Sequence, residues 1–188
     1  MKRKSVNEII KNISKEDRSE LRKAGVKIGR YHIFLPKMLK PSAVELRVKL
    51  WKLYFSEDKK YIIPKSGLNF LKDEIIKNNK FLLICGFENF GKFYVRVDIL
   101  ERLFLKIIEN TKNGIFKIDS NMMNLIGCSK ENFSKLLDLM EYKPKKIEGD
   151  KDDYFIYKPK FQRRKIVKNN KNINKDNPFD KLSELRFR

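Results

Sequence analysis

The clearest pattern of apolar and polar positions lies in residues 97–110. Apolar side chains recur there at three- and four-residue spacing, which places them on one face of a helix. This face consists of Leu100, Leu103, Phe104, Ile107 and Ile108. Charged residues, including Asp98 and Glu101, occupy other positions, and we expect them to face solvent. The pattern predicts an amphipathic helix over Val97–Asn110.

The residues after this helix predict a short strand and two more helices. Residues 115–118 can form only a brief strand, and Ser120 is a residue type that begins helices. We expect helices over residues 121–126 and 130–140, separated by Gly127 and a tight turn. Helices joined by so short a turn cross steeply, and this arrangement is a helix-turn-helix.

Two segments rich in lysine and aromatic residues follow, at 142–147 and 154–160, and a polar run joins them. This pattern predicts a β-hairpin, which is called a wing when it follows a helix-turn-helix. Its lysines can hold phosphates and its rings can stack on bases. The second helix of the pair places Lys130 among several carboxylates. We therefore expect contact with phosphates or a single strand rather than base readout.

Helices and short strands also alternate in the N-terminal half. Ser14 is placed to begin a helix that Gly25 ends, and Pro41 is placed to begin another that is apolar over most of its circumference. We expect this second helix to be central to a core. The predicted elements are a helix over 15–24, a strand over 26–35, a helix over 42–55, a helix over 68–78 and a hairpin of residues 82–87 with 94–97.

Together these elements predict an α+β fold that is mainly helical. Its predicted parts are a basic arm at 1–13, a helical region with short strands at 14–95, a winged-helix-like domain at 96–160 and a disordered basic tail at 161–188. A different interpretation of residues 96–160 stays open. Three helices and a hairpin could pack against a neighbour and contact no nucleic acid.

The charge of the chain favours a polyanionic partner. The 188 residues include 44 Lys and Arg against 24 Asp and Glu, which gives a formal net charge of +20. Such an excess attracts phosphate and makes binding sensitive to salt. Part of the excess has a compositional explanation, because Lys, Asn and Ile together are favoured by AT-rich coding sequence. The tail around Arg163, Arg164 and Lys165 would act as a flexible cationic tether.

Few residues offer catalytic or metal-binding chemistry. Cys85, Cys128 and His32 do not have the spacing of a zinc site, and we expect them in the core. Asp98 and Glu101 lie one turn apart, but no third ligand is placed to help, so we interpret them as solvated helix face. We predict no active site, cofactor or metal. The apolar runs are too short to cross a membrane and no signal-peptide pattern begins the chain, so we expect a cytoplasmic protein.

Three blocks of sequence carry a resemblance to a known family. They are Leu-Arg-Lys-Ala-Gly-Val-Lys-Ile-Gly-Arg-Tyr-His at 21–32 with the Pro-rich turn and helix after it, Val-Arg-Val-Asp-Ile-Leu-Glu-Arg-Leu at 95–103, and Met-Met-Asn-Leu-Ile-Gly-Cys-Ser at 122–129. Residues 16–142 resemble the C-terminal accessory region of bacterial superfamily 2 helicases related to the mitochondrial degradosome RNA helicase. The chain lacks the Gly-x-x-x-x-Gly-Lys-Ser/Thr motif, so the resemblance implies a part without the ATPase motor.

The leading prediction is a nucleic-acid-binding accessory module that guides a strand to or from a helicase motor, with RNA favoured over DNA by the resemblance. The predicted phosphate contacts are Lys143, Lys145, Lys146, Lys158, Lys160, Arg163, Arg164 and Lys165, with Arg30 and Lys130 as secondary contacts. Tyr142 and Tyr157 are the predicted stacking residues. Two alternatives stay open: a protein interaction module that docks a helicase or exonuclease, and a helicase whose motor domains are encoded upstream.

Overall fold

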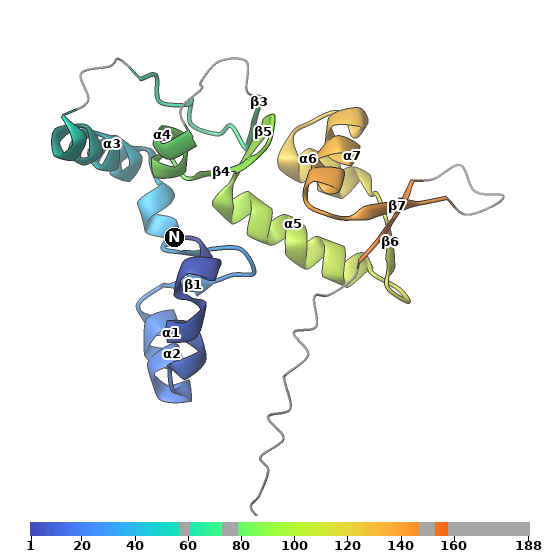
Figure 1. Ribbon diagram of the computed structural model, residues 1–188, viewed down its shortest axis with the longest axis horizontal. Helices are drawn as coiled ribbons and strands as arrows, with labels where there is room; N and C mark the ends of the chain where they lie inside the picture. The colour runs from blue at the N-terminus through green and yellow to red at the C-terminus, as the bar shows by residue number, and fades with distance from the viewer. Residues whose placement is uncertain (57–60, 73–78, 147–152, 158–188) are drawn as a thin grey trace, which may run out of the picture. The chain divides into compact units, whose positions relative to one another are not determined.

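The protein is described here from a computed structural model (Figure 1). The structure describes residues 1–56, 61–72, 79–146 and 153–157. The chain divides into two units, Met1–Lys158 and Pro159–Arg188, and the described residues all belong to the first. About 53% of the described residues are helical and the strands form small antiparallel sheets. The predicted α+β class with mainly helical content is confirmed.

The N-terminal segment is helical and then turns back as a hairpin. Its elements are η1 (Arg3–Val6), α1 (Asn7–Asn12), α2 (Lys15–Lys23), β1 (Lys27–Ile28) and β2 (Ile33–Phe34). The Ser14 side chain caps α2 as predicted by accepting a hydrogen bond from the Asp17 amide, and Gly25 follows the helix with a φ of 87°. The single strand predicted over 26–35 is wrong, because β1 and β2 pair antiparallel across four intervening residues.

The middle of the chain packs two helices against a three-stranded sheet with strand order β3-β5-β4. Its elements are η2 (Pro36–Leu39), α3 (Pro41–Phe55), β3 (Phe70–Lys72), α4 (Asn79–Ile84), β4 (Phe87–Phe90) and β5 (Phe93–Arg96). The helix predicted over 68–78 is wrong where the structure describes it, since Phe70 pairs with Val95 as part of β3. The predicted hairpin exists, but it begins at Phe87 because the residues before it form α4.

Helix α3 is less buried than its composition predicts. Val44 and Val48 face a cluster with Phe81, Leu82 and Tyr94. The leucines on the opposite side of the helix are exposed: Leu46 by 57%, Leu50 by 56% and Leu53 by 77%. The expectation that α3 is central to a core is therefore wrong, because one side of the helix packs and the other has no covering element among the described residues.

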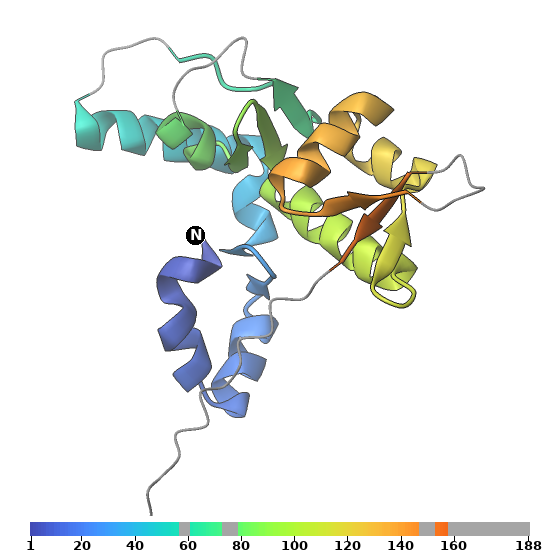
Figure 2. The ribbon, with the colours of Figure 1, turned by 45° about the vertical axis from the view of Figure 1, so that its right-hand side comes forward.

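The C-terminal part of the described chain contains α5 (Val97–Asn110), β6 (Ile115–Lys117), α6 (Ser120–Ile126), α7 (Lys130–Leu139), β7 (Lys143–Lys145) and β8 (Tyr154–Ile156). The strands form one antiparallel sheet in the order β6-β8-β7. Helix α5 has the predicted bounds and connects this sheet to the β3-β5-β4 sheet along the chain (Figure 2). Ser129 caps α7, and Gly127 ends α6 with a φ of 79°.

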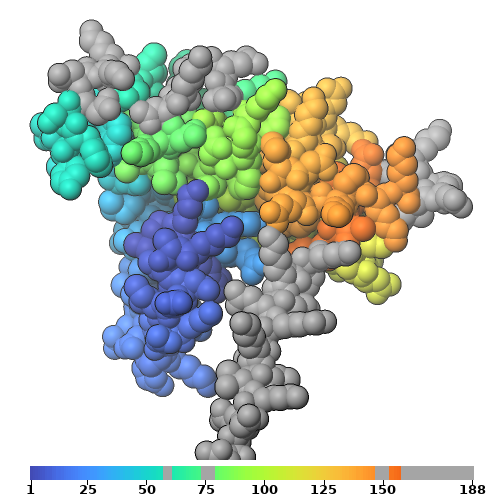
Figure 3. All heavy atoms as spheres, viewed as in Figure 1, coloured from blue at the N-terminus to red at the C-terminus, as the bar shows by residue number. Residues whose placement is uncertain are grey.

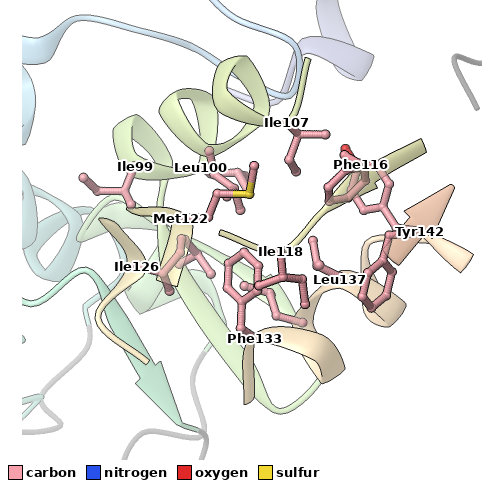
Figure 4. Packing of buried hydrophobic residues seen from close by; sticks show 14 of the residues in the cluster. Ile99, Leu100, Ile107, Phe116, Ile118, Met122, Ile126, Phe133, Leu137 and Tyr142 are labelled. Carbon is pink, nitrogen blue, oxygen red and sulfur yellow. The ribbon is translucent and has the colours of Figure 1, made fainter. Parts of the chain in front are cut away.

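One hydrophobic core joins α5, α6, α7 and the β6-β8-β7 sheet. Leu100, Leu103 and Ile107 from α5 have no exposed surface, and they meet Met122 of α6 and Phe133 of α7 (Figure 4). The predicted apolar face of α5 is correct at these positions. Tight packing of this kind fixes the position of the sheet relative to the helices.

The Glu101 carboxylate ties the N-terminal hairpin to the middle of α5. It accepts hydrogen bonds from three consecutive backbone amides, those of Arg30 at 2.5 Å, Tyr31 at 2.7 Å and His32 at 2.8 Å. Glu101 is only 9% exposed, so the expectation that it faces solvent is wrong. A buried carboxylate is stable only with such donors. The same contact explains Gly29, because a Cβ at this position would collide with the Glu101 carboxyl group.

We predict that Gly29→Ala lowers the free energy of unfolding by about 2–4 kcal/mol, because the carboxylate cannot move away without losing its amide donors. Chemical denaturation measures the change. Gly25→Ala is the matched control: Gly25 has a φ of 87° and no atom near the position of a Cβ, so the left-handed backbone alone should cost about 1 kcal/mol. Equal losses for the two variants would contradict the role of Glu101.

Candidate nucleic-acid interface

The β6-β8-β7 sheet has one buried face and one outer face. Phe116 of β6 and Phe155 of β8 pair in register and are 1% and 3% exposed. Residues that pair directly across antiparallel strands project to the same side of the sheet, and their chain neighbours project to the other side. The residues next to these phenylalanines therefore form the outer face.

A row of basic and aromatic side chains crosses this outer face. Lys145 pairs with Tyr154, and Tyr154 pairs with Lys117 on its other side. Lys143 lies two residues from Lys145 and projects to the same side of the sheet, where it pairs with Ile156. The three lysines are exposed and Tyr154 is half-buried. Lys145, Tyr154, Lys117 and Lys143 are called the outer row below.

The strands of this sheet have no acidic residue. The described residues of β6, β7 and β8 contain three lysines and no Asp or Glu, so their formal charge is +3. Asp153 precedes β8, and its carboxylate lies 2.7 Å from the Lys130 ammonium group. The orange atoms of α7 and β7 lie at the surface on one face of the molecule (Figure 3). The outer row is thus a compact cationic surface with an aromatic ring between two lysines.

The predicted contact residues differ in their exposure, and one of them is buried. Lys143, Lys145 and Lys146 are exposed, as phosphate contacts must be. Tyr142 is only 7% exposed, with its ring 5.4 Å from that of Phe116. Its assignment as a base-stacking residue is wrong, because the core covers the ring. Burial also raises the pKa of the Tyr142 hydroxyl far above its usual range.

Other predicted residues lie in less favourable places or beyond the described chain. The Tyr157 ring is half-buried between Phe104 and Tyr142, at 6.2 Å and 6.3 Å between ring centroids. The Arg30 guanidinium lies over the Phe104 ring at 5.8 Å. The remaining predicted contacts lie outside the described residues; they are Lys158, Lys160, Arg163, Arg164 and Lys165.

Two residues of the outer row were not among the predicted contacts. Tyr154 and Lys117 become neighbours only through the strand register, since β6 and β8 are far apart in sequence. The alternation within residues 115–118 did indicate that Lys117 and Phe116 face opposite sides. The register itself had no signal in the sequence, so the pairing with Tyr154 could not be predicted.

The exposed face of α7 is a poor surface for a polyanion. A shallow depression there is lined by Lys130, Glu131, Ser134, Lys135, Asp138 and Asp153. These residues include two cations and three carboxylates, a formal charge of −1. A helix that reads bases in the major groove needs donors that can reach base edges without nearby carboxylates. The expectation that α7 does not read base sequence stays a prediction, and the charge of this face is its basis.

A second cluster of charged residues is buried and structural. The His32 Nε2 atom lies 2.8 Å from one Glu88 oxygen, and Lys2 Nζ lies 2.5 Å from the other. His32 is 3% exposed, as predicted for a core histidine. Burial raises the pKa of Glu88, but hydrogen bonds and charge from His32 and Lys2 outweigh it, so the pKa lies below its usual value of 4.5. These contacts join Lys2 and His32 to Glu88 of β4, so the cluster acts as a clamp between the start of the chain and the sheet.

The described residues offer no metal site or reactive thiol. No group of three His, Cys, Asp or Glu side chains among them could hold a metal ion. Asp98 pairs with Arg96 at 2.7 Å while Glu101 binds the hairpin, so the two carboxylates do not act together. Burial raises the pKa of Cys85 to about 12 and that of Cys128 to about 11, which keeps both thiols protonated at neutral pH.

Comparison with known proteins gives no relative. Neither a protein-family model, nor a curated protein, nor a solved structure matches the chain. Within the described part of the chain, every helix is too short or too polar to cross a membrane.

We predict that Glu88→Gln lowers the free energy of unfolding at pH 7 by about 1–3 kcal/mol, because Lys2 and the buried His32 side chain lose their carboxylate partner. A carboxyl with a lowered pKa in the folded state stabilises the fold above its unfolded pKa. This contribution is lost as the pH falls through the folded pKa, so the gap between variant and parent should close in acid.

Denaturant unfolding of both proteins at a series of pH values from 7 down to 3 measures this gap. Glu20→Gln on the exposed side of α2 is the control and should change stability little at any of these values. A gap that stays constant with pH would show that Glu88 contributes by shape and not by charge.

Proposed function

We propose that the chain is a nucleic-acid-binding accessory module whose contact surface is the outer face of the β6-β8-β7 sheet. The observation that carries the proposal is the outer row, in which Tyr154 lies between Lys117 and Lys145. Lysines neutralise phosphates and release counterions, and an aromatic ring stacks on a base of any sequence. Lys146 follows β7 and is exposed, and the net charge of +20 attracts a polyanion to this part of the surface.

A single strand fits this surface better than a duplex. Stacking on Tyr154 requires an unpaired base, because bases in a duplex are covered on both faces. The carboxylates on α7 oppose entry of that helix into a groove lined by phosphates. RNA is the preferred strand in the proposal because of the resemblance of residues 16–142 to the accessory region of RNA helicases.

The order of elements supports a winged helix-turn-helix as the architecture of this part. Helices α6 and α7 are joined by a short turn, and β7 and β8 form the hairpin that pairs with β6. In the proposal this unit acts in the cytoplasm beside a separate helicase motor and holds the strand that enters or leaves it. The chain itself supplies contacts and no ATP hydrolysis.

A docking role for the same unit is the second candidate. The depression on α7 combines lysines and carboxylates, a mixture that suits a protein surface better than a phosphate backbone. A helicase or an exonuclease is the partner class in this alternative. Co-purification of such a partner that survives nuclease treatment, together with unchanged RNA affinity in outer-row variants, would favour it.

We predict that Lys143→Ala/Lys145→Ala weakens binding to single-stranded RNA of unrelated sequences to a similar extent. Two lost phosphate contacts should also reduce the slope of log K against log salt by about 1.4, at about 0.7 for each contact on a single strand. Fluorescence anisotropy with a labelled oligonucleotide at several salt concentrations measures both effects.

The control removes the same charge from another exposed surface. Lys15→Ala/Lys23→Ala on α2 should leave most of the affinity and the slope unchanged. If both double variants lose affinity equally, binding follows the total charge of the chain and the sheet has no special role.

We predict that Tyr154→Ala lowers affinity for a single strand by about fivefold or more, since stacking of one base contributes about 1–3 kcal/mol. Tyr154→Phe keeps the ring and should retain most of the affinity. Binding to a duplex of the same length should respond little to either change. If the Tyr154→Ala protein binds single strands as tightly as its parent, stacking of a base on Tyr154 is not part of the binding.

A further inference from the structure

The exposed side of α3 is an apolar feature of the described residues that the proposed function does not use. Leu46, Leu50 and Leu53 lie on this side, and Tyr54 beside them is 81% exposed. The turquoise residues of α3 lie at the surface in Figure 3. Val44 and Val48 already bury the opposite side of the helix, so these leucines are not needed for the core. Exposed apolar side chains in a contiguous stripe mark a binding surface.

The stripe has the spacing of a coiled-coil seam. Ala43, Leu46, Leu50 and Leu53 follow one another at intervals of three, four and three residues, which are the a, d, a and d positions of a heptad. They cover about 15 Å of the helix axis, at 1.5 Å per residue. A narrow seam of this kind, about two heptads long, is complementary to a single helix.

The residues beside the seam determine the charge of that partner. Arg47 occupies the e position and Lys49 the g position of the same heptads. Charges at e and g select the partner of a coiled coil, because they pair with the facing e and g positions. We propose that α3 docks a helix of another protein that has leucine-like residues at a and d and acidic residues at e and g.

Charge also argues against a second copy and against a lipid surface as occupant. Two α3 helices would bring Arg47 and Lys49 of one copy against those of the other, and each copy has a net charge of +20. A helix that lies in a membrane interface has its polar face directed to water. The side of α3 opposite the leucines is instead apolar and packed against Phe81 and Leu82. A partner helix with acidic residues is not repelled by Arg47 and Lys49, and it does not require a polar face on the opposite side of α3.

The test uses the full chain and three labelled peptides of three heptads each. The first has Leu at a and d and Glu at e and g, the second has Lys in place of Glu, and the third has Glu but Ser in place of Leu. Fluorescence anisotropy at physiological ionic strength gives each affinity. We expect the first peptide to bind at least about fivefold tighter than the others, from two favourable charge pairs and the apolar seam.

Variants on α3 separate the seam from the general positive charge of the chain. Leu46→Ala/Leu50→Ala should abolish most binding of the first peptide, while Leu105→Ala, at a position 57% exposed on α5, should not. Lys49→Glu should shift the preference toward the Lys peptide, and Arg47→Glu/Lys49→Glu should reverse it. Lys15→Glu on the exposed surface of α2 makes the same change of charge away from both α3 and the outer row, and it should leave the preference intact.

Three results would overturn the proposal. The Ser peptide could bind as well as the Leu peptide, which would reduce the effect to net charge. Sedimentation of the chain alone could show a dimer that Leu46→Ala/Leu50→Ala dissociates, which would identify a second copy as the occupant. Vesicles of phosphatidylglycerol and phosphatidylcholine could bind through the same leucines while the peptides do not, which would identify a lipid surface.

Discussion

The described structure depends on one buried carboxylate. Glu101 holds three backbone amides of the N-terminal hairpin against α5, beside the Tyr31 ring, which packs 5.7 Å from the Phe104 ring. Helix α2 buries no residue and α1 buries only Ile10, so the first part of the chain has little apolar surface with which to pack. The Glu88 clamp adds a second polar attachment to the same hairpin. Polar contacts with fixed geometry therefore orient a segment that burial alone would leave poorly constrained.

Helix α5 links this polar attachment to the proposed binding surface. Leu100, Leu103 and Ile107 on its core side pack against α6, α7 and the sheet, while Glu101 lies on the side that meets the hairpin. The core holds Phe116 and Phe155 inward, and their inward position places the outer row on the opposite side of the sheet. Cations and a ring are thus presented on a rigid support rather than on a flexible loop.

Local signals in the sequence were sufficient for the helices with strong periodicity and defined ends. The bounds of α5, the Ser14 and Ser129 caps and the stop at Gly127 follow from side-chain spacing and backbone preference. Long-range contacts were not predictable in the same way. The Phe70 strand forms because β5 offers it a partner, Glu101 is buried because distant amides reach it, and Tyr154 meets Lys117 through register alone. The sequence therefore predicts the region of the candidate site, whereas the residues that face one another in it depend on the fold.

The exposed leucines of α3 and the large positive charge have a combined consequence for the behaviour of the protein in solution. Electrostatic repulsion keeps molecules with a net charge of +20 apart even where their apolar stripes could touch. Raising the ionic strength shortens the range of that repulsion to about 3 Å at 1 M. Concentrated salt is the usual means of removing a bound polyanion from a basic protein. It therefore also weakens the repulsion that prevents nonspecific association through the exposed leucines of α3.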